Sequence, residues 1–156
     1  MIVVAKLLYV LHVLGAVFWV GGMGFALLAL RPSLAEVLPP SQRLPLLATV
    51  MRRFSLIVWH AMPVLVMTGY GLVFGVFGGF AGSGWHVHVM HGLGLAMAGI
   101  YIALFFGPLQ ALKSAAAAGE GGPAIAAAKR VGQLVAVNFG LGLATVAVAA
   151  WGRFGI

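Results

Sequence analysis

Four long apolar runs constrain this chain more than any other feature of its sequence. A helix needs about 20 mostly apolar residues to cross a hydrocarbon layer roughly 30 Å thick. Soluble domains carry about 25% charged residues, whereas this chain has 7%, with 63% apolar residues. The composition excludes a soluble enzyme, a nucleic-acid binder and a disordered segment. It predicts one all-α integral membrane domain over residues 1–156, an antiparallel up-down four-helix bundle with spans at about 7–30, 54–77, 86–109 and 131–151.

The basic residues predict the orientation of these spans. Seven of the nine lie in the first and third connections: Arg31, Arg43, Arg52, Arg53, Lys113, Lys129 and Arg130. The opposite side carries Lys6, Arg153 and an uncharged glycine-rich turn at 78–84. Basic loops stay in the cytoplasm, so we expect both termini on the non-cytoplasmic side. We therefore attribute the net charge of +7 to membrane orientation. The expected partner is the lipid bilayer, and no nucleic acid is expected to bind.

The two basic connections have different compositions. The first contains Pro32, Pro39, Pro40 and Pro45, which predicts short irregular turns lying on the membrane surface. The third contains an Ala/Gly tract at 114–128, which we interpret as mobile or frayed helix without chemistry.

Histidines inside the spans are the main candidates for function, because such residues are costly in a membrane. His12 and His91 each lie about five residues from the outer face of their spans. At about 1.5 Å per residue, both imidazoles are expected roughly 8 Å deep. Imidazole is an ordinary axial ligand of haem. The pair therefore predicts one b-type haem near the periplasmic face.

Small and aromatic residues near these histidines fit a flat cofactor. Gly15 follows His12 by three residues and shares its helical face, and Trp19 could border the same site. Several small residues follow His91: Gly92, Gly94, Ala96, Ala98 and Gly99. Such residues equally permit close packing of two helices in lipid, so this alternative stays open.

A copper site is the other use of the same residues. His86, His88 and His91, with His12 across the bundle, offer imidazole nitrogens that suit copper. Residues 88 and 91 share a helical face, but residues 86 and 88 point about 200° apart on a regular helix. His60 lies in the other half of the membrane. Its alternatives are a structural hydrogen bond, a proton relay, a substrate contact or ligation together with a methionine such as Met97.

Other polar groups in the spans are few. Thr68 and Asn138 are expected to form hydrogen bonds across the bundle. The predicted spans contain no Asp or Glu, and the chain has no cysteine. This argues against a carboxylate-driven pump and excludes thiolate sites. No catalytic residue is identified.

Three segments carry a resemblance to a known family. They are Leu11-His12-Val13-Leu14-Gly15-Ala16-Val17-Phe18-Trp19-Val20-Gly21-Gly22, Arg53-Phe54-Ser55 followed by Thr68-Gly69-Tyr70, and Gly84-Trp85-His86-Val87-His88-Val89-Met90-His91. They resemble short, single-domain members of the CopD family of bacterial membrane proteins. The resemblance implies residence in the inner (plasma) membrane and a role in copper uptake or resistance.

The first helix is also similar to that of HemJ-type protoporphyrinogen oxidases, which implies His12 as a haem ligand. Those proteins have a lysine in the third helix, where this chain has His91. The sequence thus favours a haem-binding protein of electron transfer or oxidoreduction, with copper handling or transport as the alternative. Quinone, a porphyrinogen or a periplasmic redox protein would be its redox partner, and a homodimer is compatible with the glycine content. Whether it is an enzyme stays open.

Overall fold

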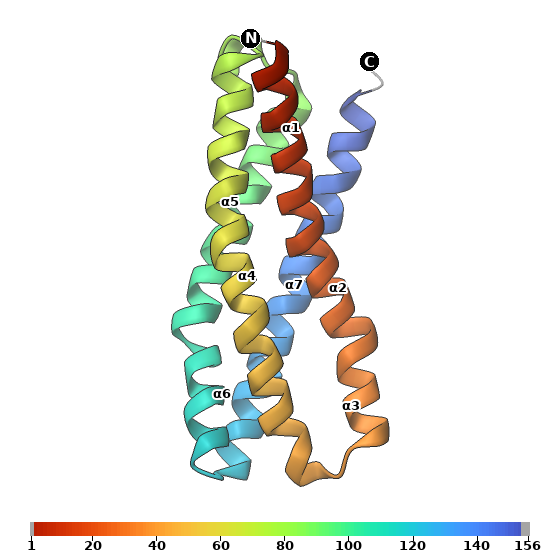
Figure 1. The fold of residues 1–156 in the computed structure, drawn as a ribbon, viewed down its shortest axis with the longest axis vertical. Helices are drawn as coiled ribbons and strands as arrows, with labels where there is room; N and C mark the ends of the chain where they lie inside the picture. Colours follow the sequence, from red (N-terminus) through yellow and green to blue (C-terminus); the bar gives the residue numbers. More distant parts are fainter. Residues whose placement is uncertain (1, 154–156) are drawn as a thin grey trace.

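The computed structural model describes residues 2–153, and they form a bundle of four long, nearly parallel rods (Figure 1). All four are long and apolar enough to cross a membrane. The all-α four-helix prediction is confirmed. The helices are α1 (Ile2–Ala16), α2 (Gly22–Phe25), α3 (Arg31–Val37), α4 (Pro40–Gly75), α5 (Trp85–Phe106), α6 (Pro108–Ala117) and α7 (Gly121–Arg153).

The first rod is continuous but contains two π-helical segments. These are η1 (Val17–Gly21), between α1 and α2, and η2 (Ala26–Leu30), between α2 and α3. π-helical turns inside α-helices are rare and occur frequently at functional sites. Trp19 and Ala26 are the buried residues of the two segments.

Prolines mark the starts of helices in this fold. Pro32 and Pro40 lie in the first turns of α3 and α4, where the missing N–H costs no helix bond. Pro108 likewise begins α6 and separates it from α5 at Gly107. Pro45 lies inside α4. The prediction of irregular turns in the first connection is therefore wrong, because three of its four prolines are accommodated within helices.

The third connection is also more regular than expected. α6 continues to Ala117 and α7 begins at Gly121. Only a tight turn separates them, in which Gly119 adopts a φ of +72° that favours glycine. The Ala/Gly tract is thus helical on both sides of this turn.

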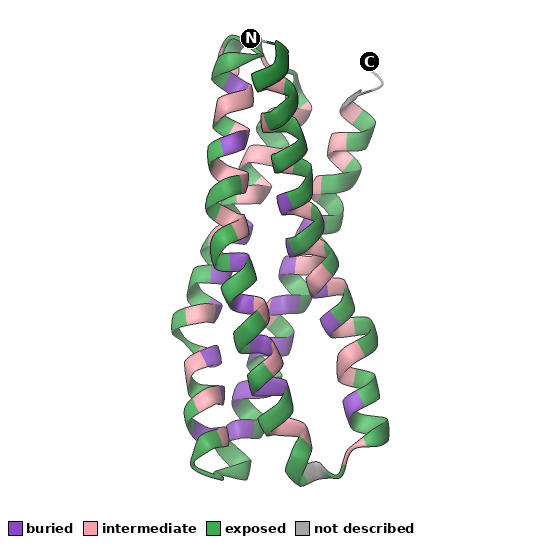
Figure 2. Cartoon of the chain, in the orientation of Figure 1, coloured by how far each residue is buried: buried purple, intermediate pink, exposed green. Residues whose placement is uncertain are grey.

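The bundle has two ends of different character. We call the end with both termini and the 76–84 turn the terminal end, and the opposite end, where α3 meets α4 and α6 meets α7, the basic end (Figure 1). α1 packs against α4, α4 against α6, and α5 and α6 against α7. Buried residues gather in the middle and toward the basic end, whereas exposed residues dominate the terminal end (Figure 2).

Candidate functional site

His12 projects from α1 onto α4, where two oxygen atoms hold one of its ring nitrogens. Its Nδ1 lies 3.0 Å from the Leu65 carbonyl oxygen and 3.1 Å from Thr68 Oγ1. The Thr68 hydroxyl donates its own proton to the Val64 carbonyl at 2.6 Å. Both oxygens facing His12 are therefore acceptors, so Nδ1 must carry the proton. The lone pair then resides on Nε2, which is the arrangement typical of metal-binding histidines.

Glycines allow α1 and α4 to approach closely around His12. A Cβ on Gly69 would lie 3.1 Å from His12 Cε1, and one on Gly15 would lie 2.9 Å from Leu65 Cγ. Gly15 therefore faces Leu65 of α4. The space beside Gly15, which we interpreted as room for a flat cofactor, is occupied by the Leu65 side chain.

His91 lies in an aromatic cluster at the terminal end. Its ring centroid is 5.4 Å from Tyr70 and 4.9 Å from Phe80. His88 also contacts Phe80, at 5.7 Å. The shared face predicted for residues 88 and 91 is thus consistent with their common neighbour.

His12 and His91 meet the same part of α4. His12 contacts Leu65, Thr68 and Gly69, and His91 contacts Tyr70. The two histidines therefore lie at a similar depth, as expected from their positions in the sequence. Gly69 and Tyr70 are consecutive and point about 100° apart on a regular helix, so the two rings reach α4 on different faces.

His86 packs against α7 and the start of its own helix. The ring of His86 contacts Trp85 and occupies the space that side chains on Gly84 or Gly152 would need. Within residues 2–153, no three His, Asp or Glu side chains come together to hold a metal ion. The structure therefore does not assemble the predicted cluster of His86, His88, His91 and His12.

His60 is exposed on the outer side of α4. Its Nδ1 donates to the Leu56 carbonyl oxygen of the preceding turn at 2.7 Å. Met97, the suggested partner, is buried in the core with 4% of its surface exposed. Among the alternatives for His60, this contact agrees with the structural hydrogen bond.

Thr68 and Asn138 form the expected bonds between helices. Thr68 contacts His12, and the Asn138 amide nitrogen donates to the Met97 carbonyl of α5 at 3.2 Å. Both side chains are buried. The second bond places Asn138 at the centre of the bundle.

A small cavity lies beside Asn138, and the sequence analysis did not anticipate it. It measures about 10 Å³, close to the space that one water molecule requires. Trp19 forms part of its wall, and its ring packs edge-on against Tyr101 at 5.9 Å. Sequence reasoning placed Trp19 near His12, but it faces this central cavity, lined by Trp19, Met23, Met51, Phe54, Ser55, Tyr101, Leu104, Val135 and Asn138.

Comparison with known families identifies the lineage of this bundle. The family model described as copper resistance protein D, CopD, matches residues 48–152, about two thirds of the chain. The chain belongs to the CopD family. No curated protein and no solved structure matches it. Family membership and the four apolar helices together make it a multi-pass membrane protein.

The CopD match divides the candidate residues into two groups. It includes α4 from residue 48, α5, α6 and nearly all of α7, with His60, His86, His88, His91 and Asn138. It leaves out the first rod, which contributes His12, Trp19 and Met23. The described contacts connect these groups, because His12 is anchored on α4 and Met23 lines a cavity shared with α7.

Proposed function

We propose that this CopD-family protein handles copper ions in the bacterial inner membrane and binds them through His12. The observation that carries the proposal is the anchored imidazole of His12, combined with the copper-resistance family. Its Nδ1–H points to the Leu65 carbonyl and Thr68 hydroxyl, which leaves Nε2 available to a metal. Neutral imidazole binds copper well.

The expected topology indicates which side of the membrane His12 is nearer. The positive-inside rule assigns the basic end to the cytoplasm, so His12 lies in the half of the membrane nearer the periplasm. Copper arriving from that side would reach His12 before the tightly packed half of the bundle. His91, at a similar depth, is the candidate for a second ligand.

A copper titration of the purified protein in detergent tests this proposal. His12→Gln should weaken copper affinity by at least about tenfold, since even the loss of a group that orients a ligand costs 10–100-fold. His60→Gln is the matched control, because His60 is an exposed histidine with the same kind of Nδ1–carbonyl bond. Equal affinities in the His12 variant and the wild type would refute the assignment.

A b-type haem between His12 and His91 is the second candidate, favoured by their similar depth. The surroundings of His12 fit it less well, because Leu65 fills the space beside Gly15. A single ion needs less room than a macrocycle, so copper fits the surroundings of His12 better than haem. A reduced-minus-oxidised absorption spectrum separates the two. A sharp b-type band that is lost in His12→Gln would favour haem over copper.

A further inference from the structure

The wall of the central cavity contains three side chains with atoms that can donate electron pairs to a metal ion. Its wall includes two thioethers, Met23 from α2 and Met51 from α4, together with the amide of Asn138 from α7. These residues come from three of the four rods and are at most 3% exposed. Asn138 is close to the midpoint of α7 (Gly121–Arg153), which places the cavity near the centre of the bundle.

The Asn138 side chain has an oxygen without a partner. Its orientation is fixed, because the Met97 carbonyl can only accept and therefore faces the amide nitrogen. This leaves Oδ1, the only buried side-chain nitrogen or oxygen atom in the described part of the chain that has no hydrogen-bond partner. A buried acceptor without a partner is unfavourable, so such an atom points to a ligand that supplies positive charge or a proton.

Two other groups of the cavity wall bear on the kind of ligand, the Tyr101 hydroxyl and the thioethers. The Tyr101 hydroxyl donates to the Ser55 carbonyl at 2.6 Å, so its proton is already used. Thioether sulfur is a soft ligand that selects Cu(I) among the metals available to proteins. The aromatic face of Trp19 in the wall is compatible with a cation.

The charge of the surroundings favours a monovalent ion. No carboxylate lines the cavity, and Arg31 and Met51 both line the neighbouring cavity toward the basic end. An arginine in that position would oppose a divalent ion more than a monovalent one. We propose that Met23, Met51 and Asn138 form a second, central site that holds Cu(I), an inference that rests on the proposed copper function.

This site is distinct from the one at His12. Met23 follows His12 by eleven residues, about 16 Å along a helix axis. The two sites would thus be successive positions along the bundle, an imidazole site toward the terminal end and a thioether site at the centre.

X-ray absorption at the copper edge tests the central site directly. Wild-type protein labelled with selenomethionine and loaded with Cu(I) should show copper–selenium scattering. The double variant Met23→Leu/Met51→Leu should lose this signal and one bound copper ion per chain. Leucine and methionine are close in volume, so the core should tolerate the change, and gel filtration and melting temperature verify that the variant folds.

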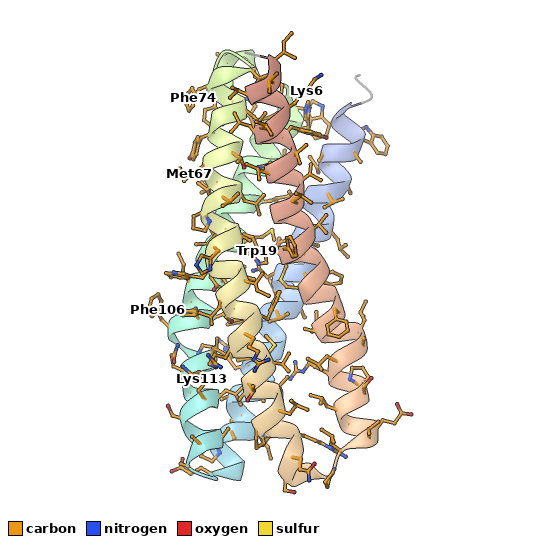
Figure 3. The ribbon with its side chains drawn as sticks, viewed as in Figure 1. Lys6, Trp19, Met67, Phe74, Phe106 and Lys113 are labelled. Carbon is orange, nitrogen blue, oxygen red and sulfur yellow. The ribbon has the colours of Figure 1, made fainter. Side chains whose placement is uncertain are left out.

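Two controls locate the signal. Met67→Leu should keep the scattering, because Met67 is 73% exposed on the outer side of α4 (Figure 3). His12→Gln should also keep it while losing the copper held by imidazole. The wild-type measurement needs no variant, so the proposal remains testable even if the double variant fails to fold.

The outcomes separate this inference from the proposed function. If the wild-type protein binds no copper, both fail. If it binds copper through His12 but shows no copper–selenium scattering, the central site is wrong and the copper function stands. The cavity would then hold a water molecule bound to Asn138.

Discussion

Replacement of Gly132 by alanine should change the sign of its effect on stability when Arg31 is absent. Arg31 reaches from the first rod onto α7, where its Nη2 donates to the Ala128 carbonyl at 2.9 Å. A Cβ on Gly132 would overlap Arg31 Nη1 and would lie 2.6 Å from Cζ. The guanidinium would have to leave, and its hydrogen bond would be lost.

Two opposing contributions determine how much Gly132→Ala changes the free energy of unfolding. A hydrogen bond to a charged group contributes about 1.5–3 kcal/mol, whereas Gly→Ala inside a helix gains about 0.8–1.0 kcal/mol. Gly132→Ala should therefore lower the free energy of unfolding by about 1 kcal/mol in the wild type. In an Arg31→Ala background the first term vanishes, and the same substitution should raise stability by about 1 kcal/mol. The coupling energy between the two sites is then about 2 kcal/mol.

The assay is reversible unfolding in mixed micelles with increasing SDS, followed by tryptophan fluorescence, for all four members of the cycle. Gly140→Ala is the control, because nothing lies within 4 Å of its Cβ position on the same helix, and it should stabilise both backgrounds equally. A coupling energy near zero would show that Arg31 does not occupy the space above Gly132.

Three further substitutions test the packing of the bundle in the same assay. Gly22→Ala should destabilise the protein by about 1–3 kcal/mol, because its Cβ would overlap the ring of Phe54, whereas Gly21→Ala, with nothing within 4 Å, should not. Asn138→Leu should change the stability of the metal-free protein by less than about 1 kcal/mol, since it removes an acceptor without a partner but also the bond to the Met97 carbonyl; a loss of more than about 2 kcal/mol would mean that the oxygen also has a partner. Tyr101→Phe should lower stability by about 0.5–1.5 kcal/mol through loss of its bond to a carbonyl of α4, and an unchanged midpoint would contradict that bond.

The helical rods were predictable from the sequence, but their ends were not. Apolar length alone identified four rods, because lipid requires every backbone bond to be satisfied within a helix. The prolines of the first connection led to the wrong prediction of irregular turns. The sequence does not distinguish a proline that ends a helix from one that begins it. Pro32 and Pro40 occupy first turns, where proline is favoured.

The level of His12 and His91 along the bundle was predictable from the sequence, but their contact partners were not. Counting residues from the span ends placed His12 and His91 at a common level, and both contact the 65–70 segment of α4. Which neighbour each ring meets depends on how the helices are rotated and on which helices are adjacent. α1 packs on α4, so the Leu65 carbonyl and the Thr68 hydroxyl of α4 are the partners of His12 Nδ1.

The π-helical segments explain why the central cavity escaped sequence reasoning. Gly15, Trp19 and Met23 are buried at intervals of four residues. On a regular helix, eight residues rotate the chain by about 80° away from the starting face. The wider turn of η1 (Val17–Gly21) reduces this rotation and keeps Trp19 and Met23 directed to the core. With this smaller rotation Gly15, Trp19 and Met23 all face the other helices, although a regular helix would turn Met23 by about 80° from the face of Gly15.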